Sequence, residues 1–437
     1  MMNTRSSRRK NRWVGVASLS VVSLFAAGCG GSAADSGPVE ITYWSWLPGA
    51  QDVVDRFEEE HPDIQVTVEN VGVATDEYTK IQNAVDAGSG GPDVAHMTYD
   101  VIPGFALTGA LADLNEFGGE GTESLFLPAV HDLVTIDEGM YAAPLDFGPG
   151  VMYYREDVLD EHGLEVPRTW EDFRAAAEVV AAAGTDQRLT FADPGLADAA
   201  YMAMWQLGAD PWSVEGEQLT LNLLNDDVEQ WADYWGSLHA DGLLLEATMG
   251  SDEWFKQIND GTIATWLVGA WGLQALVGNA PESEGLWRVA PLPSWDGKPA
   301  SGQFGGSASV VLEQSEHREA ATTFALWMNS DPAAVEIHRE YGLLPAAAAV
   351  WEDPDFLDEE ISYLGGQQAR QIFEESADST TPGWEWLPFQ TYVNGIYPDT
   401  VGQSIAGQEA TLMSGFEQWQ ERIAEYAESQ GFTVTVE

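Results

Sequence analysis

The chain has 437 residues, of which 71 are acidic and 18 are basic, so its formal net charge at pH 7 is −53. A protein that binds phosphate backbones needs clustered Lys and Arg, so this balance argues against nucleic acid as a partner. The hydrophobic content of 44% and the spread of acidic residues along the whole chain are typical of a soluble globular protein with room for two or three domains.

The first 28 residues have the pattern of a secretory signal. Five basic residues precede a mostly apolar segment, 13–27, which is too short to span a membrane as a helix. The segment ends in Ala26-Ala27-Gly28-Cys29, which resembles the lipobox of bacterial lipoproteins, with Ala26 where Leu is usual. Cys29 is the only cysteine, so no intramolecular disulfide can form and we expect Cys29 to be lipidated. A buried free cysteine is the alternative. Arg8-Arg9 leaves twin-arginine export open beside the general secretory route.

Strand and helix patterns alternate after a short tether. Residues 30–38 are small and polar, and they predict a flexible link between the membrane and the folded domain. We then expect, in order, a strand at 39–43, a helix over 50–57 that Pro62 ends, a strand at 64–68, a helix around 78–85 and a strand at 94–97. This order predicts an α/β sheet with crossover connections, whose ligands usually lie beyond the carboxyl ends of the strands.

The pattern continues after a glycine-rich break at 148–150. We expect a strand at 151–154 and then a helix that Thr169 caps, with Asp172 in the place of the usual Glu or Gln of a capping box. Two more helical faces, within 228–238 and 412–426, carry apolar residues that should pack in the core. The absence of an internal repeat in the sequence argues against a solenoid or a propeller.

The order of these segments resembles the family of bacterial extracellular solute-binding proteins that includes the maltose-binding protein. The resemblance covers nearly the whole chain after the signal. The segments that carry the resemblance are residues 41–46, 62–66, 91–94, 141–146, 153–157, 167–173, 261–264, 269–272, 290–293, 305–306 and 344–346. One departure is Arg155, where relatives commonly carry Asn, and it makes the end of that strand less certain.

The resemblance implies an α/β, two-lobed periplasmic-binding-protein fold of the type II kind, with a ligand cleft between lobes that hinge strands join. The lobes are then expected at 39–147 with 303–343 and at 148–302 with 344–437. The chain should cross between them near 148–150 and again within 293–302. Hinges of this kind absorb backbone rotation while a ligand shifts the equilibrium between open and closed forms.

The resemblance also implies the substrate-binding subunit of an ABC importer. Such a protein is a monomer that a lipid anchor holds at the outside of the cell membrane, where it passes a carbohydrate to the permease subunits. Neither enzymatic activity nor a cofactor is expected. A polyamine, a glycerol phosphodiester or a peptide are alternative ligands. A secreted glycoside hydrolase also combines aromatic residues with paired carboxylates, but the order of the segments argues against it. The seven histidines lack the short spacing of a metal site.

A sugar has apolar C–H faces and a hydroxyl edge, so its site needs aromatic rings and carboxylates or amides. The chain contains 18 tryptophans. Trp44 and Trp46 lie just beyond the first strand, and either could instead pack under a loop, so both need not line the cleft. Trp384 and Trp386 lie in a loop without helical or strand periodicity, where at least one should contact the ligand.

Two further tryptophans are candidates because of the family resemblance. Trp271, at a turn that enters a helix, stands where sugar-binding relatives place a stacking tryptophan. Trp205 lies in a segment whose Asp198 and Tyr201 match a ligand-contacting stretch, although helix packing would also explain it.

The polar edge of the site is expected from acidic residues and from the backbone. Asp100 matches a family position whose carboxylate accepts hydrogen bonds from sugar hydroxyls, and Asp146 lies at the first hinge. Gly305 and Gly306 should let the backbone approach the ligand closely, with a tight turn as the alternative. Asp93 belongs to a turn motif and is expected to be structural.

The remaining carboxylates predict a solvated acidic surface adapted to high salt, where screening makes self-repulsion tolerable. An ordinary acidic secreted protein is the alternative.

Overall fold

The computed structural model describes residues 37–136, 138–407 and 411–437. The signal, the lipidation site Cys29 and nearly all of the expected tether lie outside the described residues, so these stay predictions. Residues Pro38–Glu437 form one compact unit. Among the helices of the described residues, none has the length and apolar character needed to cross a membrane.

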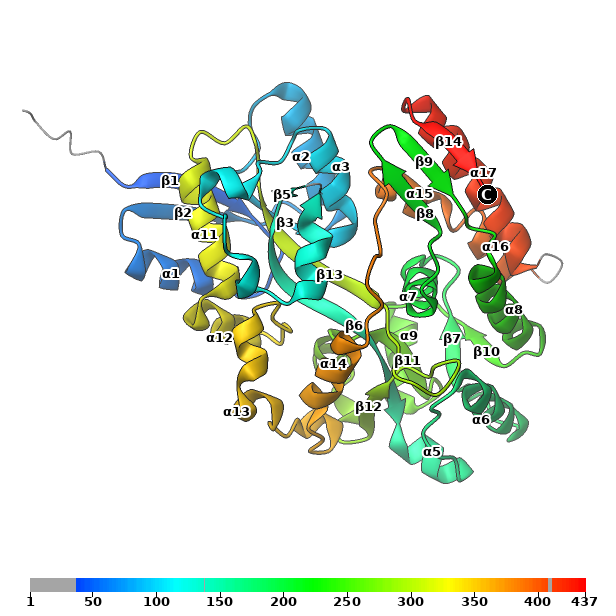
Figure 1. The fold of residues 1–437 in the computed structure, drawn as a ribbon. Helices are drawn as coiled ribbons and strands as arrows, with labels where there is room; N and C mark the ends of the chain where they lie inside the picture. Colours follow the sequence, from blue (N-terminus) through cyan, green and yellow to red (C-terminus); the bar gives the residue numbers. More distant parts are fainter. Residues whose placement is uncertain (1–36, 137, 408–410) are drawn as a thin grey trace, which may run out of the picture. The chain divides into compact units, whose positions relative to one another are not determined.

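Residues 39–98 build one end of a large mixed sheet (Figure 1). Strands β1 (Val39–Trp44), β2 (Ile64–Glu69) and β3 (Val94–Thr98) are parallel in the order β3-β1-β2, and helices α1 (Ala50–Glu60) and α2 (Thr75–Ala87) connect them. The apolar residues of α1 that recur on one helical face, Val53, Val54 and Phe57, are buried. The strands and helices expected in this region are confirmed.

Two long strands join this end of the sheet to the other. Strand β6 (Ala143–Arg155) pairs along its first half with β13 (Gln303–Val311), and β13 also pairs with β3. Along its second half β6 pairs with β11 (Thr265–Gly269) and β12 (Trp287–Pro291). The strand order is therefore β11-β6-β13-β3-β1-β2, with β12 beside β6. Strands β6 and β13 thus belong to both halves, as hinge strands must.

The glycine-rich segment 148–150 is not a break, because β6 runs through it without interruption. Its glycines allow close approach of β13 and of the residue before it. A Cβ added to Gly148 would lie 2.3 Å from the carbonyl oxygen of Phe304, and the amide of Gly150 donates to the carbonyl of Gly302 at 2.8 Å. Pro149 still accepts a hydrogen bond from the amide of Ala270 at 3.0 Å. Because Gly and Pro favour turns, the sequence predicted that a strand ends here, and the non-local pairing with β13 was missed.

The second crossing also lies later than expected. Residues 293–302 form a loop that begins beside Thr169, where Ser294 pairs with Thr169 and accepts a hydrogen bond from the amide of Trp170 at 3.1 Å. The loop ends beside Gly150 and Thr380, where Ser301 pairs with Thr380. The crossing itself is β13, whose register shifts between Gln303 and Gly306.

The other helices and strands cover and extend the sheet. They are α3 (Ile102–Leu107), α4 (Pro128–His131), β4 (Thr135–Ile136), β5 (Gly139–Met140), α5 (Glu156–His162), α6 (Trp170–Ala182), β7 (Thr190–Ala192), α7 (Asp198–Leu207), β8 (Trp212–Glu215), β9 (Gln218–Leu221), α8 (Asp226–Ala240), β10 (Leu244–Glu246), α9 (Asp252–Asp260), α10 (Gly272–Asn279), α11 (Arg318–Ser330), α12 (Pro332–Glu340), α13 (Pro354–Leu357), α14 (Ala369–Asp378), α15 (Gln390–Ile396), α16 (Val401–Ala406), α17 (Leu412–Ser429) and β14 (Thr433–Val436). Strands β14, β9 and β8 form a three-stranded sheet, and β7 pairs with β10.

Local sequence signals are confirmed at several of these elements. The hydroxyl of Thr169 accepts from the amide of Asp172 at 3.0 Å, and the carboxylate of Asp172 accepts from the amide of Thr169 at 3.2 Å, which is the expected capping box. The helices expected at 228–238 and 412–426 are α8 and α17. Arg155 anchors the end of β6, because its buried guanidinium binds both carboxylate oxygens of Asp157 at 2.8 Å and donates to the last carbonyls of α9.

The exact lobe boundaries, 39–147 with 303–343 and 148–302 with 344–437, stay a prediction. Contacts of the segment that follows Leu343 bear on them. Pro345 forms a β-bridge with Asp146 and Ala347 forms one with Phe126, while the amide of Leu127 donates to the carbonyl of Ala346 at 3.0 Å. These contacts favour assigning residues 344–347 to the first lobe.

Candidate ligand-binding site

Polar side chains from three segments meet at Tyr201 on α7. Its hydroxyl donates to Oδ1 of Asn394 at 2.7 Å and accepts from Nε2 of Gln390 at 2.8 Å. The amide of Asn394 in turn donates to Oδ2 of Asp100 at 3.1 Å. Asp100 lies in the 3₁₀ helix η1 (Tyr99–Val101), directly after β3, and α15 provides Gln390 and Asn394. The network therefore joins the carboxyl end of a sheet strand to helices α7 and α15.

Two carboxyl groups share this neighbourhood. Burial raises the pKa of Asp100 above its ordinary range. Burial also raises the pKa of Asp198 to about 7, and the nearby charge of Asp100 adds to the shift. A carboxyl group that keeps its proton near neutral pH can donate as well as accept hydrogen bonds. The pair can therefore bind a ligand hydroxyl that acts as a donor or as an acceptor.

An aromatic cluster lies against the same helix. The ring of Trp205 stacks on that of Trp384 with 5.0 Å between centroids and 6° between planes. Trp386 meets Tyr201 edge to face at 5.2 Å and Trp384 at 5.5 Å. Because Trp384 covers its face, Trp205 is only 4% exposed. Trp384 and Trp386 themselves are half-buried. The indole of Trp205 also donates to the carbonyl of Thr381 at 2.5 Å. Trp205 thus supports the tryptophan loop, and Trp384 and Trp386 retain surface for a ligand.

A second aromatic position lies beside the crossing strands. Trp271 precedes α10 and is half-buried, and its indole N–H donates to the carbonyl of Phe304 at 2.7 Å. Gly305 and Gly306 follow with φ angles of 77° and 98°, in the region that favours glycine. A Cβ on Gly305 would lie 3.1 Å from Nε1 of Trp271. The two glycines therefore let β13 pass directly beside the indole.

Asp146 lies on β6 next to this position. Its carboxylate accepts from the hydroxyl of Ser307 at 2.5 Å, and burial raises its pKa to about 6. The hydroxyl of Tyr99 donates to the main-chain carbonyl of Asp146 at 2.8 Å. Tyr99 is the neighbour of Asp100, so these contacts connect the crossing strands to the polar network around Tyr201.

The structure separates Trp44 from Trp46. The ring of Trp46 packs on His96 at 4.1 Å and on Tyr78 at 5.9 Å. The hydroxyl of Tyr78 lies 2.9 Å from that of Thr98, and burial, together with the charge of Asp100, raises the pKa of Tyr78. Trp46 is therefore connected to the Asp100 end of β3. Trp44 instead donates to the exposed carboxylate of Glu69 on β2 at 3.1 Å.

Asp93 is structural, as expected. Its Oδ2 accepts from the amide and the hydroxyl of Thr42 at 2.8 and 3.0 Å, and its Oδ1 accepts from Ser315 at 2.6 Å. It therefore fastens the turn before β3 to β1 and to the segment after β13.

Sequence reasoning missed Asn394, Gln390 and Tyr78 in this neighbourhood. Gln390 and Asn394 lie four residues apart on one face of α15, where buried apolar residues would ordinarily recur. Two amides in such a pattern directly after the Trp384–Trp386 loop are a signal that could have been used. No sequence signal marked Tyr78 as a site residue, because it falls on the apolar face of α2, where core residues are expected.

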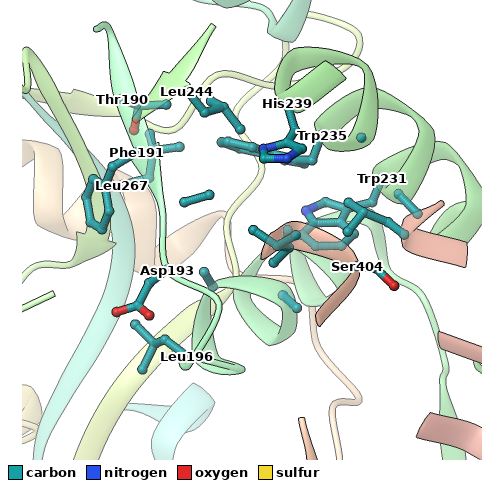
Figure 2. A pocket seen from close by; sticks show the side chains of 18 of the residues that line it. Thr190, Phe191, Asp193, Leu196, Trp231, Trp235, His239, Leu244, Leu267 and Ser404 are labelled. Carbon is teal, nitrogen blue, oxygen red and sulfur yellow. The ribbon is translucent and has the colours of Figure 1, made fainter. Parts of the chain in front are cut away.

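A separate cavity of about 840 Å³ opens among β7, α7, α8, β10 and α16 (Figure 2). The ten predicted ligand residues are all absent from its walls. Among the described residues, there is also no cluster of three or more His, Cys, Asp or Glu side chains that could hold a metal ion.

The chain belongs to the family of bacterial extracellular solute-binding proteins, whose model matches residues 43–335. It is 26% identical over 347 residues to the arabinooligosaccharide-binding protein of Halalkalibacterium halodurans, covering 75% of this chain and 76% of that protein. It is 25% identical over 406 residues to the lactose-binding protein of Rhizobium radiobacter, covering 86% and 89%. The family is one of binding proteins rather than enzymes.

Solved structures agree with this assignment. The ABC transporter associated binding protein of B. animalis subsp. lactis, in complex with β-1,6-galactobiose, has a TM-score of 0.81 and 33% identity, covering 91% of this chain and 100% of that one. The galacto-N-biose-/lacto-N-biose I-binding protein of Bifidobacterium longum, in complex with lacto-N-biose, has a TM-score of 0.80 and 27% identity, covering 92% and 100%. The predicted family and the two-lobed fold are confirmed.

Proposed function

We propose that this protein binds a mono- or oligosaccharide outside the cell membrane and delivers it to the permease of an ABC importer. The observation that carries the proposal is the convergence of Asp100, Asp198 and Asn394 beside the half-buried indoles of Trp384 and Trp386. Similarity to proteins bound to β-1,6-galactobiose and lacto-N-biose supports a carbohydrate as the ligand class.

The chemistry of this convergence suits a neutral hydroxyl-rich ring. Half-buried indole faces cover the apolar C–H surface of a sugar, and the carboxyl and amide groups exchange hydrogen bonds with its hydroxyls. Asp100 comes from the predicted first lobe, whereas Asp198 and Asn394 come from the predicted second lobe. A ligand that contacts both sets binds the closed form better than the open form and so shifts the population toward closure.

The outer parts of the site are part of the same proposal. Trp271 stacks on the ligand where Gly305 and Gly306 bring β13 close, with Asp146 behind it, and Trp46 extends the aromatic surface on the first-lobe side. Trp205 acts by supporting Trp384. Trp44 has no contact that supports a ligand role.

We also infer that Cys29 carries a lipid anchor, that the protein works as a monomer and that it has no catalytic role. The sequence Ala26-Ala27-Gly28-Cys29 supports the anchor, as does the 24% identity over 358 residues to an uncharacterized lipoprotein of Streptomyces antibioticus. A lipid anchor would keep the binding domain near the permease.

A thermal-shift screen of the protein without its first 28 residues tests the ligand class. A ligand that binds only the folded state raises the unfolding midpoint by mass action. We expect a concentration-dependent rise with at least one of β-1,6-galactobiose, lacto-N-biose, lactose or arabinooligosaccharides. Spermidine, glycerophosphocholine and a short peptide serve as controls, and a rise with one of these alone would contradict a carbohydrate ligand.

A further inference from the structure

The cavity among β7, α7, α8, β10 and α16 has the size and the walls of a binding site. Its volume of about 840 Å³ falls within the range of small-molecule pockets and far exceeds the voids of a packed core. Aromatic and aliphatic side chains dominate the walls; they include Phe191, Trp231, Trp235, Leu244 and Leu267, which gather around the space in Figure 2.

Some polar groups on these walls have protein partners, whereas the indole N–H groups of Trp231, Trp235 and Trp266 have none among the described residues. The carboxylate of Asp193 accepts from the amides of Gly195 at 2.8 Å and Met249 at 2.7 Å. The side-chain amide of Gln206 donates to the carbonyls of Pro293 and Ala300 at 2.9 and 2.8 Å. An occupant therefore gains most of its affinity from apolar contact, and an acceptor atom on it can bind the unpartnered indole N–H groups.

Charge restricts the occupant further. Asp193, Asp233 and Glu246 line the cavity together with His239, and none of the described lining residues is Lys or Arg. Asp233 and Glu246 are exposed, so the opening of the cavity carries negative charge. An organic anion such as a fatty acid would meet like charges there without a compensating cation.

The cavity lies behind the proposed sugar site and not within it. Helix α7 presents Asp198, Tyr201 and Trp205, at helical spacing, to the site described above. The cavity is lined instead by Ala199, Ala200, Met202, Ala203 and Gln206 of the same helix. The two spaces therefore use different faces of α7.

We propose that this cavity is a second binding site, which takes an uncharged aromatic or alicyclic molecule. None of the residues proposed to contact the carbohydrate lines this cavity, although Phe304 borders the cavity and accepts a hydrogen bond from Trp271.

N-phenyl-1-naphthylamine, a neutral fluorescent probe, tests the proposal. We expect saturable fluorescence enhancement with one site per chain, and an affinity at least tenfold weaker for 8-anilino-1-naphthalenesulfonate, which has the same rings and a negative charge. Leu244→Trp fills the cavity from β10 and should weaken binding of the neutral probe at least tenfold. Val179→Trp, which adds the same side chain at an exposed position of α6 outside the cavity, should leave it unchanged.

A second filling variant, Ala240→Trp at the cavity rim, keeps the test decisive if Leu244→Trp unfolds, and circular dichroism checks the fold of each variant. Absence of saturable enhancement would overturn the proposal. So would equal binding of the anionic probe, which indicates unspecific apolar surface. Weakening of the neutral probe by Trp271→Ala, with no effect of either filling variant, would place the probe at the carbohydrate site and also overturn it.

Discussion

The side-chain amide of Asn394 donates a hydrogen bond of 3.1 Å to the carboxylate of Asp100, across 294 positions of the sequence. The contact joins the end of β3 to helix α15, and Tyr201 completes it from α7. Asp100 belongs to the predicted first lobe, and Asn394 and Tyr201 belong to the predicted second lobe. A ligand hydroxyl that inserts here can take over both the donor of Asn394 and the acceptor of Asp100.

Asp100→Asn should weaken sugar binding because it replaces a charged acceptor by a neutral amide. Hydrogen bonds to charged groups contribute about 1.5–3 kcal/mol, so the dissociation constant should rise roughly tenfold or more. Calorimetric titration with the sugar found by the screen measures the change. Asp93→Asn is the matched control, since Asp93 fastens a turn, and it should lower the unfolding midpoint more than the affinity. Equal affinity of Asp100→Asn and the unmodified protein would remove Asp100 from the site.

Trp271→Ala and Trp266→Ala separate stacking on a ligand from packing in the core. The two rings lie 5.7 Å apart, but Trp266 is 2% exposed and Trp271 is half-buried. Loss of the Trp271 face should cost about 1–3 kcal/mol of binding free energy. Truncation of Trp266 should cost about 3–5 kcal/mol of the free energy of unfolding. If Trp271→Ala keeps its affinity while the unliganded protein loses stability, Trp271 is a core residue.

The contribution of Glu77 to the stability of the folded protein should fall as the pH rises from about 4.5 to 8. Burial of the side chain raises the pKa of Glu77 to about 8, and a backbone hydrogen bond from His96 and the charge of Lys80 offset only part of this shift. The folded state binds this proton more tightly than the unfolded state does. The stabilisation is therefore complete below the unfolded pKa and is lost as the pH rises through the folded pKa, at about 1.4 kcal/mol for each tenfold difference in proton affinity.

Glu77→Gln removes this titration, so the urea midpoint of the variant should vary less between pH 5 and 8.5 than that of the unmodified protein. Glu59→Gln, at a side chain 70% exposed, is the control and should leave the pH profile unchanged. Parallel pH profiles for Glu77→Gln and the unmodified protein would show that Glu77 does not titrate in this range.

The acidic composition predicts that stability rises with salt. With 71 acidic and 18 basic residues, repulsion among carboxylates is poorly compensated, and added ions screen it. The thermal midpoint should increase markedly between 0.1 M and 2 M potassium chloride. A flat dependence would favour an ordinary acidic secreted protein over adaptation to high salt.

Local patterns in the sequence were sufficient where local interactions decide the structure. The strand at Val39–Trp44, the buried face of α1 and the Thr169–Asp172 capping box each depend on residues a few positions apart. The continuity of β6 through Pro149 was missed, because it depends on pairing with β13 about 150 residues later. The sequence also could not predict that Trp44 and Trp46 have different surroundings, because the partner of Trp44 is Glu69 on the neighbouring strand.

For the candidate site, the sequence suggested residue types, and their arrangement in space came from the structure. Tryptophans in a loop and an acid after a strand indicated Trp384, Trp386 and Asp100. That Trp205 lies under Trp384, and that Asn394 completes the site, follow from packing of α7 against α15 and the tryptophan loop. Contacts of this kind join distant segments and leave no periodic signal in either one.

Isothermal titration calorimetry of the protein without its first 28 residues tests the central claim most directly. We expect β-1,6-galactobiose, lacto-N-biose, lactose or an arabinooligosaccharide to bind with one site per chain. Asp100→Asn and Trp271→Ala should each weaken that binding about tenfold or more. Absence of binding by every one of these sugars, together with one-site binding of spermidine, glycerophosphocholine or a peptide, would contradict it.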